Sequence, residues 1–145
     1  MVVFHDIDTD VAGFLITRTF ELWAHSMDIS LATGRPLLEL DDERMRTLSS
    51  RLMGAVPAAL AYRRTPAPSR TVRFVLTGAA GGCYDIPLRM GENATEPQAV
   101  IVADARELCR VAARRLQPSE LAAAIEGDGA LAQLVLADLD AFARD

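Results

Sequence analysis

The sequence contains no lysine, only two cysteines and two histidines, and no long run of apolar residues. Cys83 and Cys109 lie far apart and outside any Cys-x-x-Cys pair, which argues against a disulfide framework or a zinc knuckle and favours a reducing compartment. We expect both to be small, buried apolar side chains. No apolar stretch reaches the roughly 18 residues that a membrane span needs, and the start MVVFHDIDTD lacks the pattern of a secretion signal. We therefore expect a soluble, cytoplasmic protein.

The charge balance is acidic, with 20 Asp and Glu residues against 15 basic residues and a formal net charge of −5. Non-specific binding to nucleic acid needs a basic surface, so an acidic chain argues against it. Half of the 145 residues are hydrophobic, which is enough to form the core of one ordinary domain. We expect neither a nucleic acid nor a membrane as partner.

A long helix is predicted near the start of the chain, over about 9–33. Thr9 or Asp8 can cap it, and Gly34 can end it. One of its sides carries Val11, Phe14, Leu15, Leu22 and Ile29, and another carries Phe20, Trp23 and Met27. Apolar surface on nearly all sides is typical of a helix within a bundle.

Three later segments have the alternation of half-buried strands, at 71–78, 83–90 and 98–104. The first two flank the turn AAGG and predict an antiparallel hairpin. Further helices are expected over about 42–61, capped by Asp41 or Asp42, over 105–116, capped by Asp104, and over 129–143, with a shorter helical segment from Pro118 to the turn at 127–129. Strands and helices that are segregated along a chain indicate an α+β fold.

We therefore predict N-terminal helices followed by a small antiparallel three-stranded sheet that C-terminal helices pack against. The stretch TPAPS (65–69) has two prolines in five residues, which resist both helix and sheet. It places a boundary between a helical segment, 1–64, and an α+β segment, 65–145.

Four ionisable residues, Arg18, Glu21, His25 and Asp28, lie along one stripe of the first predicted helix. Because Glu21 and His25 are four residues apart, their side chains lie one turn above each other and can bind one divalent metal ion. Arg18 and Asp28 would then orient these ligands or balance their charge. The alternative is a surface ion pair between Arg18 and Glu21 beside a buried, hydrogen-bonded His25.

A zinc site needs at least one further protein ligand. His5, the other histidine, lies roughly 30 Å from His25 if the helix is straight, which is too far to complete a site within one chain. We therefore expect other polypeptide to supply the third ligand.

Three stretches, TRTFELWAHSMDISLATGRP, VRFVLTGAAGGCYDIPL and the tail that begins ADARELCRVAARRLQPSEL, together resemble the mycothiol-dependent maleylpyruvate isomerase family of DinB-like metal-dependent thiol transferases. The resemblance implies the last helix of a DinB-like bundle, followed by a small sterol-carrier-like domain. It implies that Glu21 and His25 are zinc ligands and that the third ligand is a histidine on an earlier bundle helix, which this chain lacks. It also places an arginine of the C-terminal domain near the active site, which we match to Arg115, with Arg114 as the neighbouring alternative.

By the same resemblance, the chemistry is zinc-assisted addition of the thiol cofactor mycothiol to an activated small-molecule substrate such as maleylpyruvate. Arg115 would hold a substrate carboxylate. A partner chain or a homo-oligomer would supply the missing helices, because the apolar helix over 9–33 predicts self-association. Two other functions stay open: a non-catalytic sterol-carrier-like binding or oligomerisation module, and a regulator with a vestigial metal site.

Overall fold

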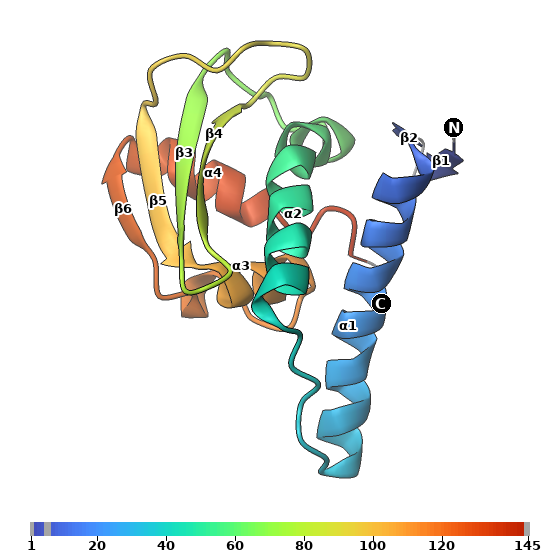
Figure 1. Cartoon of the computed structure of the whole chain (residues 1–145). Coiled ribbons are helices and arrows are strands. Elements are labelled where there is room, and N and C mark those ends of the chain that lie inside the picture. Colours follow the sequence, from blue (N-terminus) through green and yellow to red (C-terminus); the bar gives the residue numbers. More distant parts are fainter. Residues whose placement is uncertain (1, 5–6, 144–145) are drawn as a thin grey trace.

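The structure is a computed structural model that describes residues 2–4 and 7–143. In this part of the chain a β-hairpin and two long helices precede a sheet and its helices (Figure 1). The elements are β1 (Val2–Phe4), β2 (Ile7–Thr9), α1 (Val11–Thr33), α2 (Asp42–Tyr62), β3 (Thr71–Thr77), β4 (Gly82–Pro87), β5 (Ala99–Asp104), α3 (Ala105–Ala112), η1 (Pro118–Glu120), β6 (Ala124–Gly127) and α4 (Gly129–Asp138). The separation of the N-terminal helices from the later sheet confirms the predicted α+β class.

The main sheet has four strands in the order β4-β3-β5-β6, and it is mixed. β3 and β4 form the predicted antiparallel hairpin. β3 and β5, however, run parallel, with Val72 opposite Ala99 and Thr77 opposite Asp104. β6 pairs antiparallel with the other side of β5. The prediction of a three-stranded antiparallel sheet is therefore wrong in the number of strands and in the direction of one pair.

The loop of residues 88–98 makes the parallel pair possible, because it carries the chain from β4 across the start of β3 to β5. Thr71, buried at the first position of β3, holds this loop. Its hydroxyl accepts a hydrogen bond from the N–H of Thr95 (2.8 Å), and its N–H donates to the side-chain oxygen of Gln98 (3.0 Å). Sequence periodicity identifies strands but contains no information on such a distant contact, so it could not predict the strand order.

Three helical segments end earlier than the sequence predicts. α3 stops at Ala112 and α4 at Asp138, and only residues 118–120 of the short segment after Pro118 form a helical turn. Residues 124–127 form the edge strand β6, where the prediction has a helix. This four-residue stretch has no period of its own, and its strand conformation depends on the hydrogen bonds that β5 supplies.

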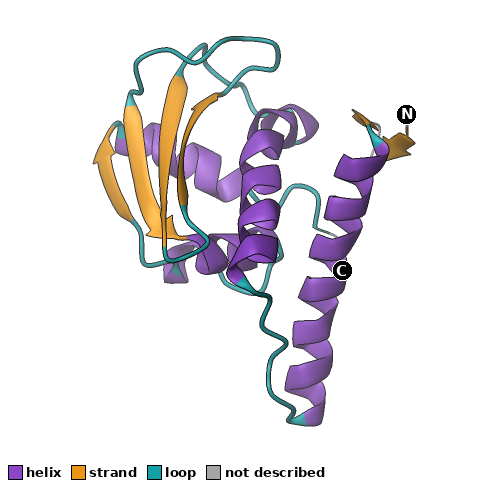
Figure 2. Ribbon diagram, in the orientation of Figure 1, coloured by secondary structure: helices purple, strands orange, loops and turns teal. Residues whose placement is uncertain are grey.

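One core lies between the sheet and the helices α2, α3 and α4, which cover the same face of the sheet (Figure 2). The fully buried side chains come from each of these elements: Phe74 and Ile101 from the sheet, Met45 from α2, Leu108 from α3 and Val135 from α4. Because α2 belongs to this core, the core extends across the predicted boundary at residue 64. That boundary itself stays a prediction.

α1 packs beside α2 at the edge of the molecule (Figure 1). Asp10, rather than the predicted Thr9 or Asp8, caps this helix, because its carboxylate accepts a hydrogen bond from the N–H of Gly13 (2.6 Å). Gly34 ends the helix in the left-handed conformation, with φ 65°, as predicted.

The apolar side chains of α1 divide into a buried and an exposed set. Trp23 and Met27 are buried against the rest of the molecule. The second set, which we call the apolar ridge, remains 57–67% exposed and consists of Val11, Leu15, Leu22 and Ile29. α1 therefore has an apolar side that this chain does not cover, although no helix in the described part of the chain is long and apolar enough to cross a bilayer.

Replacing Thr71 with valine keeps the shape of the side chain but removes the hydroxyl that holds the loop 88–98. The N–H of Thr95 then loses its acceptor, so we expect Thr71→Val to lower the free energy of unfolding by about 1–3 kcal/mol. Thr77→Val, at the exposed other end of β3, is the matched control and should change it by less than about 0.5 kcal/mol. Urea unfolding followed by circular dichroism measures both, and equal losses would contradict this role of Thr71.

Candidate functional site

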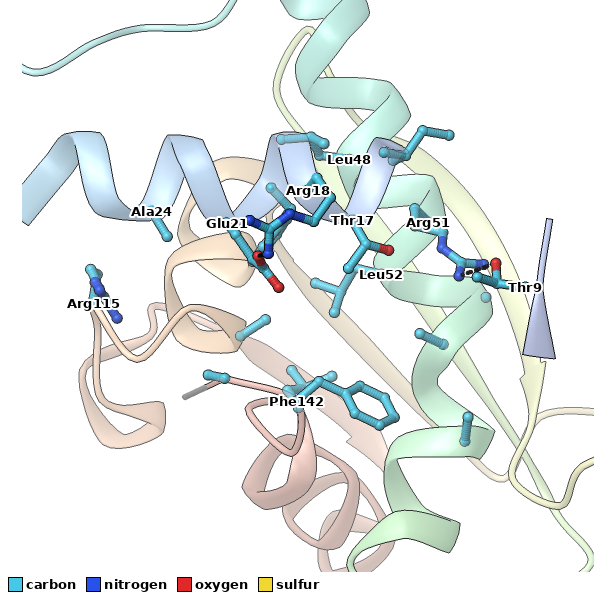
Figure 3. A pocket seen from close by; sticks show the side chains of 18 of the residues that line it. Thr9, Thr17, Arg18, Glu21, Ala24, Leu48, Arg51, Leu52, Arg115 and Phe142 are labelled. Atoms are coloured by element: carbon cyan, nitrogen blue, oxygen red, sulfur yellow. Dashed lines mark hydrogen bonds and ion pairs between the residues drawn. The ribbon is translucent and has the colours of Figure 1, made fainter. Parts of the chain in front are cut away.

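A pocket of about 550 Å³ lies between α1, α2 and the C-terminal helices. Its apolar lining includes Phe20 of α1. Leu52 of α2 and Phe142 after α4 belong to the same lining (Figure 3). Its polar lining consists of Thr9, Thr17, Arg18, Glu21, His25, Arg51 and Arg115. Four of the five site residues predicted from the sequence therefore line one pocket, and the fifth, Asp28, contacts two of them, His25 and Arg115.

The ionisable side chains of α1 form two local pairs. Arg18 forms an ion pair with Oε2 of Glu21, and the two side chains point toward each other at the pocket wall (Figure 3). His25 Nδ1 lies 3.4 Å from Asp28 Oδ2. The surface pair of the alternative interpretation is thus present, but its buried histidine is not, because the His25 side chain is 59% exposed.

Arg115 joins the C-terminal part of the chain to α1 through Asp28. Its Nε donates to Oδ1 (2.9 Å) and its Nη2 donates to Oδ2, so the guanidinium binds the carboxylate through two hydrogen bonds. The Arg115 side chain is 17% exposed and that of Asp28 is 46% exposed. The hydrogen bond and the charge of Arg115 hold the pKa of Asp28 below its usual value, and His25 adds a smaller effect in the same direction.

The end of α3 explains why Arg115, and not Arg114, reaches α1. The N–H of Arg115 donates to the carbonyl of Arg110 (2.8 Å) and the N–H of Arg114 to that of Val111 (3.0 Å), which is the pattern of a Schellman motif. Arg114 has the left-handed conformation that this motif requires, with φ 58°, and its Nε binds Asp140 (2.7 Å). The reversal that follows turns Arg115 toward α1.

Arg51 of α2 is a pocket residue that the sequence analysis missed. Its Nη2 donates to Oγ1 of Thr9 (3.2 Å), a neutral acceptor, and within the described residues it has no carboxylate partner. Gly13 leaves room for this hydroxyl, because a Cβ there would lie 2.6 Å from Oγ1 of Thr9. One feature of the sequence could have indicated Arg51 as a pocket residue. It follows Leu48 by three residues and therefore lies at the border of the apolar stripe of α2.

Glu21 and His25 supply two donors of the kind that zinc binds, a carboxylate oxygen and an imidazole nitrogen. Because Asp28 faces Nδ1, Nε2 is the nitrogen available to a metal, as in sites where a carboxylate orients a metal-binding histidine. Among the described residues, no group of three or more His, Cys, Asp or Glu side chains is placed to hold a metal ion. His5 lies outside the described residues. The donor set thus fits two ligands of a zinc site and one supporting carboxylate.

The two cysteines occupy opposite environments. Cys109 on α3 is buried, and this burial raises the pKa of its thiol to about 12. Cys83 on β4 is exposed, so the prediction that both are buried is wrong for Cys83. It stands opposite Val75, on the face of the sheet that does not carry Phe74.

A thiol reagent should modify one cysteine in the folded protein, because reaction requires an accessible and partly ionised thiol. We expect Cys83 to react at about pH 8 and Cys109 to react only after unfolding. Counting modified thiols with and without urea measures this. Cys83→Ser is the control, and fast modification of that variant would contradict the assignment.

The ion pair between Asp28 and Arg115 should make stability depend on pH in the acid range. Since folding lowers the pKa of Asp28, the pair stabilises the fold fully above about pH 5, and this contribution falls as the pH drops below about 4. Asp28→Asn should therefore be less stable than the wild type at neutral pH, and the difference should disappear in acid. Urea unfolding across this pH range measures it. In an Arg115→Gln background the same substitution should show only the smaller pH dependence that His25 causes.

Comparison with protein-family models, with curated proteins and with solved structures finds no match to this chain. The resemblance to the maleylpyruvate isomerase family stays a prediction, and a function has to be argued from the pocket itself.

Proposed function

We propose that this chain provides Glu21 and His25 as two ligands of a zinc site of the maleylpyruvate isomerase type, which other polypeptide completes. The reaction would be addition of a thiol, with mycothiol as the proposed cofactor, to an activated small molecule. One observation supports this proposal above the others. Arg115 binds Asp28 across 87 positions of the chain, and it lines the same pocket as Glu21 and His25.

The pocket has the size and the chemical character of a small-molecule site. A volume of about 550 Å³ lies within the usual range for such sites, which combine apolar walls with a few polar groups. Here the apolar residues share the pocket with Glu21, His25 and three arginines. A substrate and a thiol carrier would therefore meet next to Glu21 and His25.

Asp28 and Arg115 act in this proposal as positioning residues. Arg115 holds the carboxylate of Asp28, and Asp28 faces Nδ1 of His25, which directs the lone pair of Nε2 to the metal. Arg18 holds one oxygen of Glu21, and the other oxygen is available as a ligand. A bound zinc ion would lower the pKa of a coordinated thiol, so that the thiolate is present near neutral pH.

Two arginines of the pocket are candidates to bind a substrate carboxylate. Arg115, the residue that the resemblance indicates, already engages Asp28 through two hydrogen bonds. Among the side chains that the structure describes, only the hydroxyl of Thr9 binds Arg51, so a carboxylate can pair with Arg51 without displacing a charge from these residues. We therefore add Arg51 to Arg115 as a substrate-binding residue.

The apolar lining supports a second candidate function, the metal-independent binding of a small amphipathic molecule. Such a ligand would place its apolar part on Phe20, Leu52 and Phe142 and its anionic end beside Arg51. This candidate needs no third metal ligand. Removing Glu21 or His25 would then leave binding almost unchanged.

Zinc binding tests the first candidate. Equilibrium dialysis followed by elemental analysis should find zinc bound to the wild-type chain, and His25→Ala or Glu21→Gln should abolish binding because each removes a ligand. Asp28→Asn should weaken zinc affinity by about tenfold or more, since it removes the carboxylate that orients His25.

His5→Ala is the matched control, because it removes the other histidine of the chain. Zinc binding should survive it, and a loss would show that His5 of the same chain or of a second copy is the third ligand. A wild-type chain that binds no zinc even when a DinB-like bundle segment carrying the third histidine is added would refute the metal proposal and leave the amphipathic-ligand candidate.

A further inference from the structure

The apolar ridge of α1 is an exposed surface that the proposed chemistry does not use. Its members are separated by four, seven and seven residues, so they lie along one side of the helix. Trp23 and Met27, which face the body of the molecule, lie on the opposite side. A single chain therefore leaves the ridge in water along most of the length of α1, which is typical of an interaction surface.

The charges beside the ridge indicate its partner. Arg18 and His25 are each within one turn of Leu22, so the row of Arg18, Glu21, His25 and Asp28 borders the ridge. Read from the N-terminus, this row is basic, acidic, imidazole, acidic. In an antiparallel second copy the order is reversed, so that the basic position of one row meets the last acidic position of the other and the first acidic position meets the imidazole. The row is therefore complementary to a reversed copy of itself.

We infer that the ridge binds a second copy of this chain, with the two α1 helices antiparallel, and that the partner contributes donors to the Glu21–His25 site. Such an isologous contact brings the same surface together from both subunits. In antiparallel helix pairs, each flank of one helix meets the same flank of the other, so the charged row of one subunit faces the charged row of its partner.

One register satisfies both the apolar and the polar contacts. If the two-fold axis crosses α1 between residues 22 and 23, each of the following pairs lies level to within one residue, about 1.5 Å of helix rise. The pairs are Leu15 with Ile29 of the partner subunit, Arg18 with Asp28 of the partner subunit, and Glu21 with His25 of the partner subunit. Leu22 then lies beside its own symmetry mate, at the centre of the contact.

This contact supplies what the single chain lacks. Two copies bring two carboxylates and two imidazoles to one flank of the helix pair. A catalytic zinc site uses three protein ligands, so these four side chains are enough to complete one. The role of these donors rests on the proposed zinc function, whereas the contact itself does not. Because the body of each subunit lies on the side of α1 opposite the ridge, the two bodies point away from each other.

Two exposed leucines of α1 provide a matched pair of variants to test the contact. Leu22, 67% exposed, is at the centre of the ridge, and Leu31, 73% exposed, lies off the ridge near the end of the helix. Sedimentation at several concentrations should find a dimer for the wild type and for Leu31→Glu. Leu22→Glu should weaken the dimer by about tenfold or more, because it places a charge in the apolar contact. Circular dichroism checks that both variants stay folded.

Disulfide trapping tests the direction of the helices. In a Cys83→Ser background, mixing Leu15→Cys with Ile29→Cys should give a covalent heterodimer, whereas Leu15→Cys alone should not cross-link to itself. Self-cross-linking of Leu15→Cys would indicate parallel helices and overturn the inference.

The remaining outcomes separate the contact from the metal function. A monomeric wild type would overturn the inference and assign the ridge to a different polypeptide, as would equal effects of Leu22→Glu and Leu31→Glu. Full zinc binding by monomeric Leu22→Glu would refute the shared site and the completion of the site by other polypeptide, but leave Glu21 and His25 as zinc ligands. An antiparallel dimer without zinc would refute the donor role of the second copy, while the helix contact and the zinc proposal with a different partner would stand.

Discussion

The two hydrogen bonds between Arg115 and Asp28 connect α1 to the C-terminal part of the molecule at the pocket. Both side chains are partly exposed, and exposed ion pairs contribute little to stability. The main effect of this pair is to fix the positions of the two side chains. It places a guanidinium next to the stripe of α1 and fixes the carboxylate that faces His25. The polar wall of the pocket, and with it every role that we assign to Glu21 and His25, depends on this connection.

The position of Arg115 depends in turn on the strand order. β5 lies beside β3 because the loop 88–98 crosses the start of β3, and α3 follows β5 directly, capped by Asp104. The Schellman motif at the end of α3 then turns the chain back toward α1. In a simple antiparallel meander β5 would pair with β4 instead of β3, so α3 would begin on the far side of β4 and not beside β3. The mixed topology is therefore a condition for the pocket.

α1 shows how one helix can serve two surfaces. Its buried side packs against the body of the molecule, and its apolar ridge stays in water although it has the composition of a core. Between these two sides runs the charged row, so the pocket and the proposed contact with a second copy share Arg18, Glu21 and His25. A change at the ridge can thus affect the metal-binding pair without touching it.

Short-range features could be read from the sequence alone. The caps Asp41 and Asp104, the end of α1 at Gly34, the core face of β3 and the common stripe of Glu21 and His25 all follow from residues at most a few positions apart. The strand β6, the exposure of Cys83, the burial pattern around α1 and the entry of Arg51 into the pocket could not. Each of these depends on residues that are distant in the chain, and their contacts form only when the layers pack. Local hydrogen bonding and periodicity specify an element, but the burial of its sides and the neighbours of its edges are properties of the assembled molecule.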